Sequence, residues 1–120
     1  MSSELYTVTV DAADPHRLAK FWSELLDFKI TFDSEEEVAI ERQDESGPAI
    51  LFGKNSDAKA VKNRVHFDLN PDDQAAEVDR ALELGATHVD IGQTNDPDVT
   101  WKVLADPEGN EFCILTPRKD

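Results

Sequence analysis

The sequence predicts an α+β fold made of two modules, each with the element order β-α-β-β-β. Three observations predict it: short stretches in which apolar and polar residues alternate, two stretches with the spacing of an amphipathic helix, and a return of the same order in the second half. The chain has 120 residues, a length that suits one domain. We therefore expect a single domain over residues 1–120, with one module in 1–56 and the other in 62–120.

The first module begins with residues 5–11, LYTVTVD, which alternate and are rich in β-branched side chains, as in a strand. Asp14 and Pro15 follow, and these residue types favour the N-cap and the first position of a helix. The helix has one apolar face, formed by Leu18, Phe21, Trp22 and Leu25. Acidic and Gly-Pro turns then separate three expected strands at 28–34, 38–43 and 49–53.

The second module follows a polar connection at 54–63 and repeats this pattern. A strand is expected at 64–69, and Asp72 or Asp73 caps the next helix, which ends at Gly85. The apolar face of this helix is expected to contain Ala75, Val78 and Leu82. The last three strands are expected at 87–92, 99–105 and 111–116.

Aligning the two helix caps, Asp14 with Asp73, exposes a weak internal repeat. Val8 then matches Phe67, and Val10 matches Leu69. The order of the elements supports this repeat better than residue identity does.

The net charge and the cysteine content indicate which classes of partner to expect and in which cell compartment the protein works. The chain has 26 acidic and 12 basic residues and a net charge of −14, so we expect neither nucleic acid nor a membrane surface as partner. The acidity favours a cationic ligand, or it serves solubility or adaptation to a salty interior. The sequence has one cysteine, no apolar run long enough to span a membrane and no signal-peptide pattern, so we expect a cytoplasmic protein.

Four strings, taken with the doubled element order, suggest a family. ADPHRLAKFWSELLDF, KNRVHFDL, ELGAT and ADPEGNEFCIL together resemble the vicinal oxygen chelate superfamily, which contains glyoxalases, bleomycin-resistance proteins and extradiol dioxygenases. The closest likeness is to its small glyoxalase-like branch. The resemblance implies two modules whose curved mixed sheets surround a cavity. It also implies that the protein binds a small-molecule ligand and forms a homodimer.

The resemblance also implies four metal-ligand positions, in the first and last strands of each module. Carried over to this chain, they are Thr7, Gly53, His66 and Cys113. Glycine has no ligand atom and threonine is a poor ligand, whereas His66 and Cys113 suit zinc or a softer ion. We therefore expect no complete metal site, and a divalent ion (Zn, Fe, Ni or Mn) only if His66 and Cys113 find a further ligand.

Strand alternation gives an independent view of these residues. Thr7 and Thr9 share one strand face; so do His66 and Asp68 on another strand, and Glu111 and Cys113 on a third. We expect these mixed faces to look into the cavity. If the first and last strands of the second module pair, as the resemblance implies, their four side chains cluster.

Three interpretations of this cluster stay open. His66, Cys113 and one carboxylate, Glu111 or Asp68, can form a three-ligand metal site that activates water or polarises a carbonyl. Alternatively, the carboxylates are solvated and Cys113 fills space as a small hydrophobe. In the third, Cys113 is a nucleophile with His66 as its base, although a carboxylate nearby disfavours the thiolate.

A tryptophan and two histidines lie outside this cluster in the sequence. Trp101 shares a strand face with Val99 and Val103, where it either stacks on a flat ligand or joins the core. His16 and His88 are expected at the surface.

The sequence thus supports two functions of different classes. The chain binds a small molecule without a complete metal site, as bleomycin-resistance relatives do, or it is a metal-dependent lyase, isomerase or dioxygenase that uses His66 and Cys113. An interaction module without catalysis is a third possibility, since fold alone does not determine function.

Overall fold

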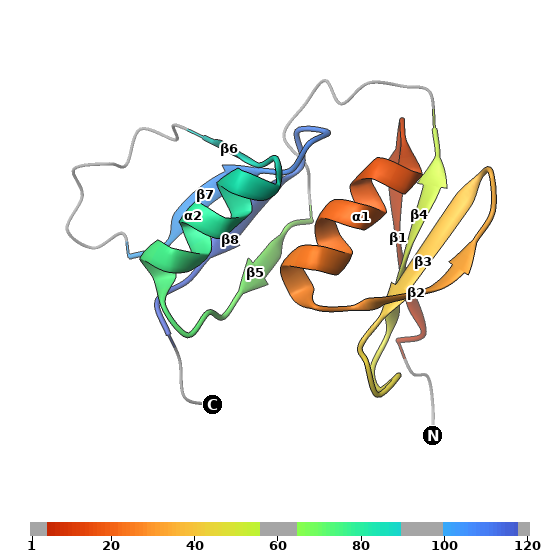
Figure 1. Cartoon of the computed structure of the whole chain (residues 1–120), viewed down its shortest axis with the longest axis horizontal. Coiled ribbons are helices and arrows are strands. Elements are labelled where there is room, and N and C mark those ends of the chain that lie inside the picture. Colours follow the sequence, from red (N-terminus) through yellow and green to blue (C-terminus); the bar gives the residue numbers. More distant parts are fainter. Residues whose placement is uncertain (1–4, 56–64, 90–99, 118–120) are drawn as a thin grey trace. The chain divides into compact units, whose positions relative to one another are not determined.

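The structure, a computed structural model, describes residues 5–55, 65–89 and 100–117 (Figure 1). The chain divides into two compact units, residues 1–58 and 59–120. Each unit has the order β-α-β-β-β, one helix and one four-stranded mixed sheet. This confirms the predicted α+β class and the doubled element order.

The first unit consists of β1 (Thr7–Ala12), α1 (Pro15–Leu26), β2 (Lys29–Asp33), β3 (Glu37–Glu41) and β4 (Ala49–Lys54). Its strands lie in the order β1-β4-β3-β2. β1 is parallel to β4, and the other neighbours are antiparallel. The chain crosses from β1 through α1 before it returns to the sheet, so α1 covers one sheet face (Figure 1).

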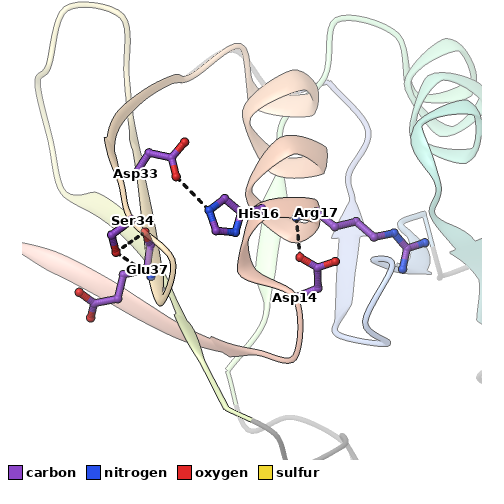
Figure 2. Close-up of polar contacts among 6 residues, drawn as sticks. All are labelled: Asp14, His16, Arg17, Asp33, Ser34 and Glu37. Carbon is purple, nitrogen blue, oxygen red and sulfur yellow. Dashed lines mark hydrogen bonds and ion pairs between the residues drawn. The ribbon is translucent and has the colours of Figure 1, made fainter.

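Helix α1 begins as the sequence predicts. The Asp14 carboxylate accepts a hydrogen bond from the backbone N–H of Arg17 at 3.2 Å, and Pro15 opens the helix (Figure 2). The helix ends at Asp27, which adopts a left-handed conformation with φ of 56°. Both ends therefore follow from local chemistry.

The core of the first unit lies between α1 and the sheet. The predicted helix face is buried, and Trp22 stacks edge-on against Phe21 with ring centroids 5.2 Å apart. Register pairs Val38 with Phe52 and Ile40 with Ile50, so these four buried side chains share the face below α1. Within residues 5–55, the part of this unit that the structure describes, no second helix is present to cover the opposite face of the sheet.

The second unit consists of β5 (Phe67–Leu69), α2 (Gln74–Leu84), β6 (Thr87–His88), β7 (Lys102–Ala105) and β8 (Glu111–Ile114). Its strands lie in the order β5-β8-β7-β6, with β5 parallel to β8 (Figure 1). Asp73, not Asp72, is the N-cap, since its carboxylate accepts from the backbone N–H of Ala76 at 3.1 Å. Gly85 ends the helix with φ of 123°, as predicted.

The core of the second unit is smaller. Leu104, Phe112 and Ile114 are buried from the sheet, together with Ala81 of α2 and Ala86. The expected helix face needs a correction, because Ala75 is exposed and Val78 and Leu82 are only half-buried. Ala81 is the fully buried residue of α2, so the face is rotated toward it.

The strand starts also differ from expectation. Tyr6 and Val65 belong to the strands expected at 5–11 and 64–69, but they are 86% and 73% exposed. β1 starts only at Thr7 and β5 only at Phe67, so both side chains precede the ladder that would have buried them.

Some expectations fall outside the described residues. They are most of the connection at 54–63, residue 64 of the strand at 64–69, residues 90–92 of the strand at 87–92, and residue 99 of the strand at 99–105. Among the described residues, neither helix is long and apolar enough to cross a membrane.

Candidate functional site

The open face of the second sheet gathers three residues that can bind a metal ion. Cys113 of β8 is paired with Asp68 of β5 on one side and with Val103 of β7 on the other. Directly paired residues share a sheet face, and this face is opposite to that of Phe112, which is buried. The expected pairing of the first and last strands is present, and it brings Asp68 to Cys113.

His66 completes the cluster from the residue just before β5. One ligand atom each from His66, Asp68 and Cys113 lies within 4.8 Å of the other two. The Nε2 atom of His66 is 3.1 Å from Oδ1 of Asp68. These two side chains are about half exposed, at 51% and 53%, and Cys113 is half-buried. The cluster therefore lies at the surface of the sheet, within reach of a solute.

The donor types fit a borderline divalent ion. The cluster offers one imidazole nitrogen, one carboxylate oxygen and one thiolate, all of which are zinc ligands. Three protein ligands are also the number that a catalytic zinc ion uses, with the fourth position open. Ligands of one tetrahedral zinc ion lie about 3.5 Å apart, so the cluster has only to close slightly. The same atoms can also stay as an ion pair beside a half-buried thiol.

The structure distinguishes the two carboxylates that sequence reasoning left open. Glu111 is on the same face, opposite Ala105, and is half-buried. Among the described residues, however, the group of close ligand atoms contains Asp68 and not Glu111. Strand register explains this, because Asp68 is directly across from Cys113, whereas Glu111 lies two residues along β8.

A polar turn positions β8 and hence Cys113. Asp106 is 3% exposed, and its carboxylate accepts hydrogen bonds from the backbone N–H groups of Glu108 and Asn110 at 3.0 and 2.9 Å. The side-chain amide of Asn110 donates to both carboxylate oxygens, at 3.2 and 3.0 Å. The turn DPEGN, singled out in the sequence, is thus held by one buried carboxylate immediately before the strand.

In the first sheet, the positions that correspond to the His66, Asp68 and Cys113 cluster do not carry a comparable set of metal ligands. Thr7 is paired with Ala49, Thr9 with Leu51, and Asp11 with Gly53. The internal repeat matches Thr9 with Asp68, so the pairing makes Leu51 the counterpart of Cys113. Gly53, the position carried over from the resemblance, lies two residues further along β4. Neither Leu51 nor Gly53 offers a ligand atom.

The open face of the first sheet instead holds a hollow of about 730 Å³. Its lining comes only from the first unit and includes Thr7, together with Tyr6, Phe32, Ala39, Glu41 and Leu51. Tyr6 is 86% exposed and Phe32 is 51% exposed, so two aromatic rings border open space. Of the expected binding residues of this module, Thr7 lines the hollow, and Thr9 is exposed on the same strand.

Sequence reasoning missed Phe32, Glu41 and Glu45. The signal was available in part, because Ala39 and Glu41 alternate with the buried Val38 and Ile40. Phe32 could not be assigned in this way, since the pairing of β2 with β3 shifts between Ile30 and Phe32. That irregularity changes which residues of β2 reach the open face.

Ser34 and Glu37 close the hairpin between β2 and β3, just beyond Phe32 in the chain (Figure 2). The Ser34 hydroxyl donates to the carbonyl of Glu37 at 3.2 Å and accepts from its N–H at 3.1 Å. Figure 2 also shows His16, from the first turn of α1, with its Nε2 2.9 Å from Oδ1 of Asp33 at the end of β2. His16 is exposed as expected, but its partner was not foreseen.

The turn after β3 forms another border of the hollow and carries several charges. The Nζ atom of Lys29 is 2.7 Å from Oε2 of Glu45, which lines the hollow. Hydrogen bonds from the hydroxyl and then the N–H of Ser46, at 2.6 and 2.9 Å, lower the pKa of the Asp44 carboxyl below its ordinary 3.8. The Asp44 carboxylate thereby orders the backbone next to Glu45.

Trp101 and His88 take less part in either site. Trp101 is half-buried just before β7, so the described structure places it neither fully in the core nor at an open surface. Its expected neighbour Val99 lies outside the described residues. His88 is exposed on β6, as expected.

Comparison with known proteins relates the whole chain to one family. A family model described as Glyoxalase-like domain matches residues 7–115. The comparison with curated proteins found no match.

Three solved structures illustrate the likeness of fold. A glyoxalase/bleomycin resistance protein/dioxygenase family enzyme from Burkholderia phytofirmans PsJN is 20% identical with a TM-score of 0.73, covering 97% of this chain and 100% of its own. A bleomycin resistance determinant encoded on the transposon Tn5 is 18% identical with a TM-score of 0.62, covering 98% and 100%. The fosfomycin resistance protein FosX from Listeria monocytogenes, crystallised with Mn(II) and a dihydroxypropylphosphonic acid, is 16% identical with a TM-score of 0.72, covering 98% and 93%. These identities support a shared fold.

Proposed function

This chain belongs to the glyoxalase-like domain family, and from this premise we propose that it binds a small organic molecule without a complete metal site. The observation that carries the proposal is the hollow on the open face of the first sheet. Its volume of about 730 Å³ lies within the range of small-molecule sites, about 300–1,000 Å³. The lining combines aliphatic and aromatic side chains with a few polar groups, as ligand sites do.

The first module also supports this proposal by what it lacks. Thr7 and Gly53 stand at two of the metal positions that the family resemblance implies, and Leu51 stands at the counterpart of Cys113 by strand pairing. None of these side chains is a good metal ligand. The open face of the first sheet is therefore suited to hold an organic ligand directly.

A fragment screen by two-dimensional NMR on the full chain tests this function. We expect aromatic fragments to shift the backbone amides of Phe32 and Leu51 in a saturable way. Leu51→Glu places a charge on the floor of the hollow and should weaken fragment binding by about tenfold or more, since burying an unpaired charge is costly. Leu26→Glu, at the end of α1 outside the hollow, is the control, and equal losses in both variants would contradict the proposal.

A second function is favoured by the His66, Asp68 and Cys113 cluster: a metal-dependent lyase, isomerase or dioxygenase. Zinc, iron, nickel or manganese are the ions proposed, with zinc best matched by the N, O and S donors. An ion held there would supply a Lewis acid for a substrate oxygen. His66, Asp68 and Cys113 would hold this ion, and His66 and Asp68 would then contact the ion in place of each other.

Metal analysis of protein purified without chelator and without a metal-binding tag tests this second function. We expect about one equivalent in the parent and a loss in Cys113→Ala and Asp68→Asn, since removal of one of three ligands leaves an incomplete set. Glu111→Gln is the matched control, because Glu111 lies on the same strand face outside the cluster. Less than about a tenth of an equivalent in the parent would rule out a resident metal.

We also propose a cytoplasmic homodimer that binds neither nucleic acid nor membranes, which the family resemblance and the net charge of −14 support. Sedimentation equilibrium at micromolar concentration is the test. A mass equal to one chain would contradict the dimer.

A further inference from the structure

The charged side chains that line the hollow of the first unit are acidic. Among the described residues, its lining includes two carboxylates, from Glu41 and Glu45, and no basic side chain. The side chain of Arg42 lies next to Gly47 of the lining, since a Cβ added at Gly47 would be 3.7 Å from Arg42 Cδ. Lys29 of β2 pairs with Glu41 in the strand register. Its ammonium group is 2.7 Å from the carboxylate of Glu45. One of the two carboxylates is therefore already compensated.

Glu41 is the uncompensated carboxylate. It is half-buried at the end of β3, and its side chain has no hydrogen bond or ion pair with another described residue. A partly desolvated carboxylate gains more from a cation than one that is fully hydrated, because the effective dielectric around it is lower. The other charges of this region, Asp44 and Arg42, belong to the adjoining turn and are exposed.

Two aromatic rings complete the chemistry. Tyr6 and Phe32 line the same hollow as Glu41 and are exposed toward solvent. The face of an aromatic ring attracts an organic cation and also covers its apolar body. Ala39 and Leu51, paired across β3 and β4, form an apolar floor between them.

We propose that the hollow of the first sheet selects an organic monocation with an aromatic or aliphatic body, and that Glu41 determines this selectivity. The inference rests on the proposed small-molecule function and names the class of ligand. The ammonium group lies against the Glu41 carboxylate, and the apolar body lies over Ala39 and Leu51 between the two rings. A carboxylate or phosphate ligand is disfavoured, since the described lining offers it two acidic side chains and no basic one.

Three ligands that share one ring test this proposal on the full chain: benzyltrimethylammonium, benzyl alcohol and benzoate. We expect the cation to bind about tenfold or more tightly than the alcohol at low ionic strength, because the quaternary ammonium is attracted to the Glu41 carboxylate and to the aromatic rings. Benzoate should bind most weakly, because the carboxylates of the lining repel it. Glu41→Gln should weaken binding of the cation by about fivefold to thirtyfold and leave the alcohol unchanged.

The matched control must separate Glu41 from the acidity of the whole chain, since a net charge of −14 attracts any cation. Glu37→Gln removes the same charge from the same strand, and Glu37 is exposed and is not part of the lining. We expect this variant to bind all three ligands as the parent does. Equal weakening in both variants would overturn the proposal and leave only diffuse attraction.

Failure of the inference and failure of the proposed function give different results. If the alcohol or benzoate binds as tightly as the cation, with shifts at Phe32 and Leu51, the hollow binds small molecules but charge selection is refuted. If the fragment screen and all three ligands leave these amides unshifted, the proposed function fails as well.

Discussion

Asn110 donates three hydrogen bonds to the Asp106 carboxylate, one from its backbone N–H and two from its side-chain amide, at distances from 2.9 to 3.2 Å. This pair closes the turn that begins β8, and the Asp106 carboxylate is almost completely buried. The strand that follows carries the buried Phe112 and Ile114 on one face and Cys113 on the other. The geometry of the candidate metal cluster therefore depends on a turn outside it.

Asp106→Ala should destabilise the protein by about 2–3 kcal/mol, because it leaves the partly buried N–H groups of Glu108 and Asn110 without an acceptor. Asp106→Asn keeps one side-chain oxygen and should cost less. Urea unfolding, followed by tryptophan fluorescence, measures the change. Asp72→Ala, at an exposed position before α2, is the control, and an equal midpoint for the Asp106 and Asp72 variants would contradict the assigned role.

Gly85 and Gly53 form a second comparison. Gly85 has φ of 123°, which side chains rarely adopt, although an added Cβ would meet only Pro107 Cγ at an ordinary 3.5 Å. Gly85→Ala should therefore cost about 1–2 kcal/mol of backbone strain. A Cβ added at Gly53 would meet no atom within 4 Å, so Gly53→Ala should be neutral or slightly stabilising. Thermal unfolding of both variants checks this, and a loss at Gly53 as large as that at Gly85 would be inconsistent with it.

Leu18 and Leu5 are chemically equal and differently buried. Leu18, on the buried face of α1, is 0% exposed, and Leu5 is 69% exposed at the hollow. Leu18→Ala should lower the free energy of unfolding by about 2–5 kcal/mol, since it removes packed atoms and leaves a cavity. Leu5→Ala should change it by less than about 0.5 kcal/mol. Chemical denaturation of the two variants decides, and similar losses would show that Leu5 is packed.

Asp44 should have a carboxyl pKa below its ordinary 3.8, because the hydroxyl and N–H of Ser46 donate to its charged form. A lowered folded-state pKa means that the folded state holds the proton less strongly than the unfolded state. Asp44 therefore contributes stability above its unfolded pKa, and this contribution is lost as the pH falls through the lower folded value.

NMR titration of the Asp44 carboxyl carbon measures this value directly. Ser46→Ala removes the hydroxyl donor, so the Asp44 pKa should rise toward 3.8 while the N–H donor remains. Ser34→Ala, which removes a hydroxyl from the other hairpin of the same unit, should leave it unchanged. An unaltered Asp44 pKa in Ser46→Ala would refute the assigned cause.

Local features of the fold could be predicted from the sequence with accuracy. The N-cap of α1 at Asp14, the C-cap of α2 at Gly85 and the buried face of α1 are all as expected. Each depends on residues within a few positions of one another, so local hydrogen-bonding and hydrophobic spacing determine it. The strand ends were predicted less accurately, because a strand ends where its neighbour stops pairing. Tyr6 and Val65, which precede β1 and β5, are exposed for this reason.

The candidate site was predictable only in part, for the same reason. Alternation placed His66, Asp68, Glu111 and Cys113 on open faces, but it could not tell which carboxylate meets the thiol. Register decides this: Asp68 is across from Cys113, and one ligand atom of each lies in the cluster with His66.

The sequence by itself determined the element order, the helix caps, the acidic character and the membership of a family with two similar modules. The tertiary structure decided where side chains from separate strands meet. It placed Leu51 rather than Gly53 opposite Thr9, shifted β2 so that Phe32 reaches the open face, and left Glu41 uncompensated beside the Lys29–Glu45 pair. The physical reason is that contacts between strands depend on register and on irregularities such as the shift in β2, which join residues far apart in the chain.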